Sequence, residues 1–64
     1  MLVSKDVYEA MELLLKPIGY LSASAESKAI ARSLEVYEDR GEFDGTFDSA
    51  INCLSMAGYE IAEN

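Results

Sequence analysis

Residues 3–18 have the sequence VSKDVYEAMELLLKPI, and this stretch decides the fold. Its apolar residues recur at spacings of four, four, three and four, which places them on one face of an α-helix: Val3, Val7, Met11, Leu14 and Ile18. Ser4 is a suitable N-cap for this helix. Because Pro17 disfavours helical geometry at the residue before it, the helix is predicted to stop near residue 15 or 16, and a turn is expected at residues 18–20.

A second helix is predicted over residues 24–40. Ser22 or Ser24 can cap it, Glu26 lies in its first turn, and Gly41 suits a left-handed C-terminal cap. Its buried face is predicted to consist of Ala23, Ser27, Ile30, Leu34 and Tyr37.

A loop that contains two glycines follows at residues 41–45 and leads to a third predicted helix. Asp44 or Thr46 can cap this helix, which is expected to end at Gly58. Its core stripe is predicted to be Phe47, Ala50 or Ile51, Leu54 and Ala57. Residues 59–61 alternate in polarity, so they are expected to form either a short strand or an extended tail that packs Ile61 onto the core.

These elements predict an all-α fold, a small three-helix bundle in a single domain over residues 1–64. Because the sequence offers one candidate strand, no second strand is available to form a sheet with it. Half of the residues are apolar, so a packed core is expected despite a net charge of −7. The free energy of unfolding should be only about 3–5 kcal/mol, because a chain this short buries little surface.

The absence of histidine removes the commonest general base and the commonest metal ligand, so we expect neither an enzyme nor a cofactor. Cys53 is the single cysteine and is better explained as a buried structural thiol than as a nucleophile. In residues 40–48 acidic residues alternate with other residues, as they do in a calcium-binding loop. If Gly45 is set at the sixth position, however, Arg40 falls at the first ligand position and Ile51 at the twelfth, so no metal site is predicted.

A cytoplasmic location is expected, in the host cell if the gene belongs to a phage. One cysteine allows no internal disulfide, which favours a reducing compartment. The first residues reach a charge too early for a signal peptide, and no apolar run approaches the length of about 20 residues needed for a membrane span.

The charge is distributed unevenly along the chain. Residues 1–32 hold four acids and four bases, whereas residues 33–64 hold eight acids and Arg40 as their single base. Six of these acids lie between residues 35 and 48, at the end of one predicted helix, in the loop and at the start of the next helix. An asymmetry of this kind bears on partners and association rates more than on fold.

Two interpretations of this acidic segment remain open. It is either a solubilising surface or a face that docks on a basic surface of another protein, where opposite charge speeds association and sets orientation. For the second interpretation the predicted partner-binding residues are Glu35, Glu38, Asp39, Glu42, Phe43, Asp44 and Asp48. Phe43 and Phe47 would be aromatic anchors if either is exposed, and Tyr37 could join them, although Phe47 is better explained as a core residue.

In size, charge and lack of catalytic residues, the chain resembles small acidic inhibitors of phages and mobile elements, such as anti-CRISPR and anti-restriction proteins. Many of these are nucleic-acid mimics that occupy a nucleic-acid channel with spaced carboxylates. The resemblance implies an inhibitor of a basic, nucleic-acid-binding site, and it transfers no individual residue.

Two alternatives compete with this function. The chain could be a small regulatory or antitoxin-like subunit that covers the surface of a toxin or enzyme. It could also be a structural homodimer joined through Leu13, Met56 and a strip formed by Ala25, Ala29 and Val36, since these residues fall outside the predicted core stripes. Direct nucleic-acid binding is disfavoured because the five bases form no patch along the sequence.

Overall fold

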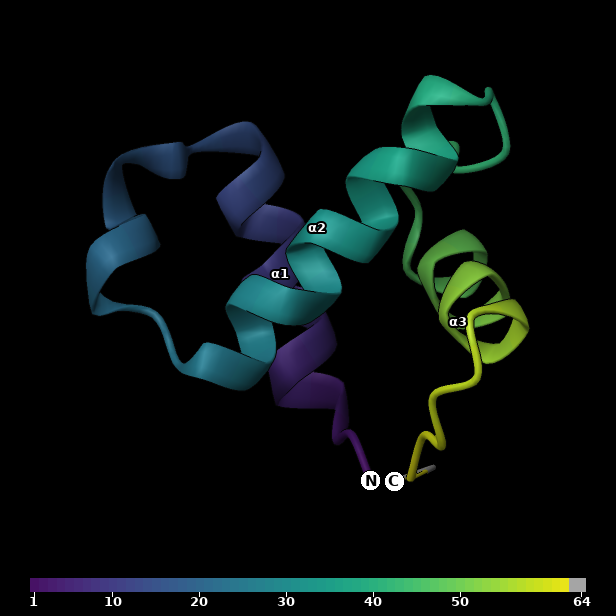
Figure 1. Ribbon diagram of the computed structural model, residues 1–64, viewed down its shortest axis with the longest axis horizontal. Helices are drawn as coiled ribbons and strands as arrows, with labels where there is room; N and C mark the ends of the chain where they lie inside the picture. The colour runs from purple at the N-terminus through teal and green to yellow at the C-terminus, as the bar shows by residue number, and fades with distance from the viewer. Residues whose placement is uncertain (63–64) are drawn as a thin grey trace.

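The computed structural model describes residues 1–62, with the side chains of Pro17 and Ile18 outside the described part. In order, its elements are α1 (Ser4–Leu15), the 3₁₀ helix η1 (Pro17–Ser22), α2 (Ala25–Asp39) and α3 (Phe47–Met56) (Figure 1). The predicted all-α three-helix architecture is confirmed. No helix within residues 1–62 has the length and apolar character that crossing a membrane requires.

Helix α1 buries a face slightly different from the predicted one. Val7 and Ala10 are fully buried, and Met11 and Leu14 pack partly against the core. The prediction was wrong for Val3, which is exposed because it precedes the helix in an extended N-cap conformation. Ser4 is therefore the first helical residue and not the cap.

Leu13 was predicted to project from the core but is only 7% exposed. The reason is tertiary: η1 folds back beside α1, and Leu13 lies in the hollow between them with Gly19 and Ala23. The expected turn at residues 18–20 is part of this 3₁₀ helix, which begins at Pro17. The place of Ile18 in the predicted stripe lies outside the described side chains.

Helix α2 begins and ends close to the residues that its capping signals predicted. The Ser24 hydroxyl accepts a hydrogen bond from the Ser27 N–H at 3.1 Å, which satisfies a free N–H of the first turn. The predicted buried face is confirmed at its centre, where Ser27, Ile30 and Leu34 have no exposed surface. At the other end Gly41 has a φ of 77°, and its N–H donates to the Glu38 carbonyl at 2.9 Å.

Helix α3 is capped by Thr46, whose hydroxyl accepts from the Ser49 N–H at 3.2 Å. Ala50 and Leu54 are fully buried as predicted, and Cys53 is buried with them. Ala57 is exposed because it follows the last helical residue as the C-cap, so its place in the predicted stripe was wrong.

The two ends of the described chain pair with each other. Leu2 and Ile61 form a single parallel bridge, in which the Leu2 N–H donates to the Glu60 carbonyl at 2.8 Å and the Ala62 N–H donates to the Leu2 carbonyl at 2.7 Å. Residues 59–62 are thus an extended tail. The expectation that no sheet forms is confirmed for the described residues, although the tail makes this one isolated bridge to Leu2, which lies buried in the core.

Candidate partner-binding site

Helices α1 and α2 end at the same side of the molecule. Helix α2 starts beside the middle of α1, where the Ser24 N–H donates to Glu9 Oε1 at 3.4 Å. It ends beside the end of α1, where Leu15 and Glu38 line a common hollow. Figure 1 shows both helices rising to the upper part of the view, where α1 ends on the left and α2 on the right. Each brings the negative end of its dipole there. Neither has a basic residue in its last turn, but the C-cap residue of each is basic, Lys16 for α1 and Arg40 for α2.

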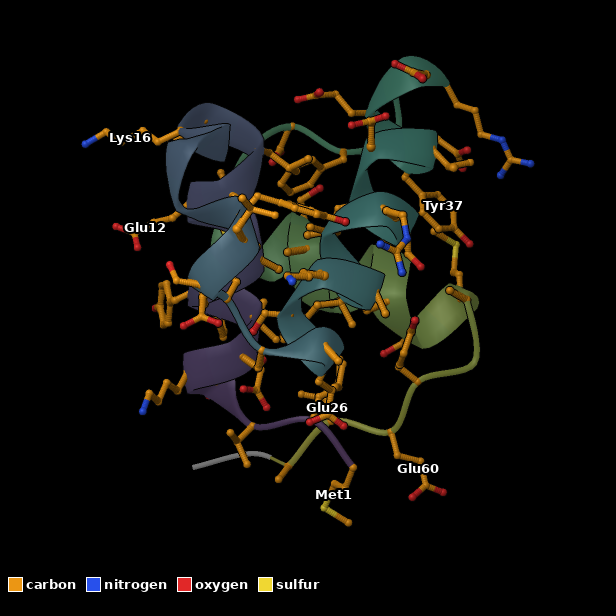
Figure 2. All side chains as sticks on the ribbon, turned by 60° about the vertical axis from the view of Figure 1, so that its left-hand side comes forward. Met1, Glu12, Lys16, Glu26, Tyr37 and Glu60 are labelled. Carbon is orange, nitrogen blue, oxygen red and sulfur yellow. The ribbon has the colours of Figure 1, made fainter. Side chains whose placement is uncertain are left out.

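The carboxylates follow this arrangement. Five of the six predicted acids belong to the second half of α2 and the loop that follows it, and all five are exposed: Glu35, Glu38, Asp39, Glu42 and Asp44. We call this region the acidic end. Figure 2 shows oxygen-tipped side chains gathered around the end of α2 at the top of the view. Negative side chains at a helix C-terminus interact unfavourably with the dipole, so this arrangement costs stability.

Asp48 lies apart from the acidic end. It is in the first turn of α3, where its charge suits the positive end of the dipole. It lines a hollow with Ser4, Ile51 and Ile61, on the side of the start of α1 and the tail. The expectation that all six acids converge on one end was therefore wrong for Asp48.

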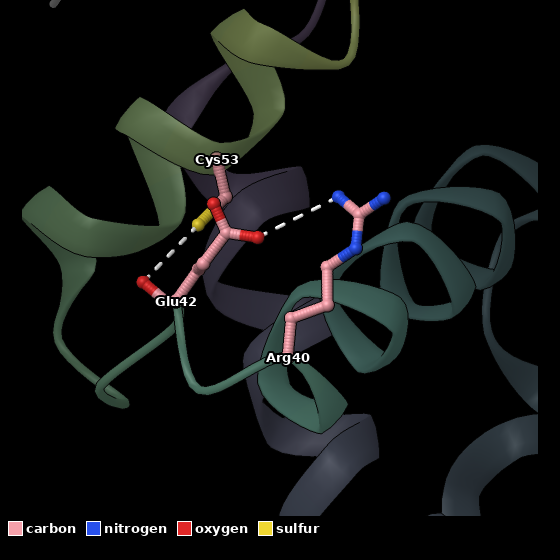
Figure 3. Close-up of polar contacts among 3 residues, drawn as sticks. All are labelled: Arg40, Glu42 and Cys53. Carbon is pink, nitrogen blue, oxygen red and sulfur yellow. Dashed lines mark hydrogen bonds and ion pairs between the residues drawn. The ribbon is translucent and has the colours of Figure 1, made fainter.

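Internal neutralisation of the acidic end is small. Arg40 Nη1 lies 3.5 Å from Glu42 Oε2 (Figure 3), and the guanidinium also lies 5.5 Å from the centre of the Tyr37 ring. An exposed pair of this kind contributes about 0–1 kcal/mol. Among the described residues Arg32 forms no ion pair with a carboxylate, and its Nη1 donates to the Tyr20 hydroxyl at 2.6 Å.

Asp44 has a structural role in the loop. Its Oδ1 accepts from the Thr46 N–H at 2.9 Å and from the Thr46 hydroxyl at 2.7 Å. These two hydrogen bonds hold the pKa of Asp44 below its usual value. They also position Thr46 to cap α3. Asp44 is therefore part of the loop framework, whatever else it contacts.

Phe43 was predicted as a partner-binding anchor on the condition that it is exposed, and this condition is not met. The left-handed turn at Gly41 sends the chain back over the end of α1, so Phe43 is only 8% exposed and faces Met11 and Leu14. Phe47 is partly buried and stacks on Tyr8, with ring centroids 4.4 Å apart. Tyr37 is also partly buried.

The exposed apolar residues differ from those that the homodimer alternative requires. Met56 is 61% exposed as expected, but Leu13 is buried. Sequence reasoning missed Leu15 and Leu21, which are 82% and 91% exposed. A helical wheel could have shown Leu15, because it lies about 80° from the centre of the stripe on the opposite flank from Leu13.

Within residues 1–62, no group of three or more histidine, cysteine, aspartate or glutamate side chains could hold a metal ion. Cys53 is buried as predicted, and its thiol donates to the Glu42 carbonyl at 3.7 Å (Figure 3). This contact fastens the loop to α3. The side chains that the acidic end exposes are carboxylates, with the apolar Leu15 beside them.

Comparison of the chain with protein-family models, curated proteins and solved structures gives no match.

Proposed function

We propose that this protein is a binding module that docks its acidic end on a basic surface of another protein and thereby inhibits or regulates it. The observation that carries the proposal is that two helix C-terminal ends, which share a hollow, and five exposed carboxylates lie on one side of a small fold. A domain with little stability to spare tolerates this repulsion at a cost, which a partner of opposite charge would offset.

The type of partner follows from the charge pattern. A cationic surface would gain Coulomb energy from the carboxylates and from both helix ends, and long-range attraction would raise the association rate. A protein site that otherwise holds nucleic acid has such a surface. Occupation of that site by the acidic end would exclude the nucleic acid, which is the inhibitory form of the proposed function.

A charge-matched pair of variants tests the proposal. The first carries Glu38→Gln, Asp39→Asn and Glu42→Gln, and it leaves Asp44 unchanged because Asp44 holds the loop. The control carries the same change in net charge outside the acidic end, at three exposed acids that Figure 2 labels: Glu12→Gln, on the η1 side of α1, Glu26→Gln and Glu60→Gln. Both variants should keep the helical circular dichroism of the parent.

The parent and the two variants are each immobilised and exposed to a cell extract, and the proteins that each retains are identified by mass spectrometry. The expected result is that the parent and the control retain the same basic proteins and that the first variant does not. These proteins should elute at high salt. Equal retention by the two variants would show that net charge alone is responsible and would refute a specific acidic end.

A further inference from the structure

We propose that the hollow between the ends of α1 and α2 is a receptor for one arginine side chain of the partner. We call this hollow the Leu15 notch. It has a volume of about 60 Å³ and is lined by Met11, Leu14, Leu15, Glu38, Phe43 and Gly45. This inference rests on the proposed function and names the contact at the centre of the acidic end.

The walls of the notch are apolar while its rim is negative. Met11, Leu14 and Phe43 form the inner surface and are themselves held by the core. Leu15 stands at the opening and is 82% exposed, although it is a large apolar side chain at the last position of α1. Because the core already holds the inner wall in place, a ligand would bind here without the cost of ordering these side chains.

Glu38 gives the notch its charge. It is the one ionisable side chain among the described residues that line the hollow. The neighbouring cations are directed elsewhere: Arg40 contacts Glu42 and Tyr37, and Lys16 lines the hollow on the η1 side of α1. Figure 2 shows Lys16 pointing outward, away from the end of α2.

Arginine fits this combination of surfaces. Its methylene stem can cover the exposed Leu15 while its weakly hydrated guanidinium lies against apolar walls. The same guanidinium can donate two parallel hydrogen bonds to the Glu38 carboxylate, and the carbonyl groups at the ends of both helices favour its positive charge. The small volume suits the end of one long side chain and not a folded segment.

A second copy of the chain is a poorer occupant. Each copy carries a net charge of −7, so close approach at this end would bring two sets of carboxylates together. The described C-terminal tail is also excluded, because Ile61 is paired with Leu2, whereas the notch lies at the other end of α1.

The test is a titration of ¹⁵N-labelled protein with acetyl-Gly-Arg-Gly-amide, followed by amide chemical shifts. The expected result is a saturable shift concentrated at Leu14, Leu15, Glu38, Phe43 and Gly45. The same peptide with citrulline, which keeps the shape and lacks the charge, should bind at least about threefold more weakly.

Variants separate the notch from general attraction by charge. Leu15→Ala and Glu38→Gln should each weaken peptide binding by at least about threefold. Leu21→Ala removes a leucine outside the notch that is even more exposed than Leu15, and it should leave binding unchanged. Because Leu15 and Leu21 are both exposed, neither alanine variant should alter the helical circular dichroism.

The proposal is overturned if the peptide shifts no notch amide, if the shifts spread evenly over all exposed acids, or if Leu15→Ala binds like the parent. In each of these cases the proposed function stands as long as the charge-matched variants differ in the proteins that they retain. The proposed function is tested by a separate measurement, and it would be refuted if the two charge-matched variants retained the same proteins.

Discussion

Neutralising the last turn of α2 should stabilise the protein. In the double variant Glu38→Gln, Asp39→Asn, each side chain keeps its size and nearly its helix propensity, so charge is the main property that changes. Both carboxylates are exposed and lie at the negative end of the α2 dipole. Neither forms an ion pair with a lysine or arginine of the described residues, where the single bridge is Arg40 to Glu42.

The magnitude follows from two contributions. An unfavourable charge in the last turn of a helix costs about 0.3–1 kcal/mol, so removal of two gives about 0.6–2 kcal/mol. Relief of the repulsion between Glu35 and Asp39, four residues apart, adds about 0.2–0.5 kcal/mol. In a domain of this size each kcal/mol raises Tm by about 4–8 °C. The gain should shrink at 1 M salt, where the Debye length is about 3 Å.

Thermal unfolding followed by circular dichroism at low and high salt measures this effect. Glu26→Gln is the matched control, because Glu26 lies in the first turn of the same helix, where its charge is favourable. The control should lower Tm at low salt while the double variant raises it. A double variant with Tm equal to or below that of the parent at low salt would refute the view that this end is electrostatically strained.

Four further predictions concern the core, the loop and the thiol. Leu34→Ala should cost about 2–5 kcal/mol, which is comparable with the whole stability, so urea titration should find the variant largely unfolded. Thr46→Ala should cost about 1 kcal/mol in the same titration through loss of the α3 cap. Hydrogen bonds lower the pKa of Asp44 in the folded state. The stability that Asp44 contributes is therefore present above its unfolded pKa of about 3.9 and is lost as pH falls through the lower folded value. Between pH 6 and 3 the free energy of unfolding should depend less on pH in Asp44→Asn than in the parent. Cys53 should react with a thiol reagent at the rate of unfolding, and Leu34→Ala should react faster.

The helices could be predicted from the sequence because their signals are local. Ser24, Gly41 and Thr46 act through hydrogen bonds to residues within a few positions of themselves, so cap rules locate the ends of α2 and the start of α3. Apolar spacing likewise identified Val7, Leu34 and Leu54 as core residues, since a stripe on one helix face must be covered in a compact domain.

Tertiary contacts decided what the sequence left open. Leu13 and Leu15 lie on opposite flanks of the α1 stripe, and only the return of η1 on one side determines that Leu13 is covered and Leu15 is not. Phe43 is buried because a loop turns back over α1, and Ile61 pairs with Leu2 across the full length of the chain. None of these contacts has a local signal.

The same limit applies to the candidate site. Exposure of the carboxylates follows from their position on polar faces, and the sequence shows their clustering between residues 35 and 48. Their direction depends on how the helices cross, which places Glu38 beside Leu15 and Asp48 beside Ile61. The notch, with one wall from α1 and one from α2, could not be foreseen from either segment alone.

The most direct test of the acidic end is the dissociation constant of a recovered partner protein with the two charge-matched triple variants, measured at one salt concentration. Loss of three interfacial charges at about 0.2–1 kcal/mol each predicts that Glu38→Gln, Asp39→Asn, Glu42→Gln binds about tenfold more weakly than the parent. Glu12→Gln, Glu26→Gln, Glu60→Gln should stay within about threefold of the parent. Equal weakening by the two variants would contradict the account.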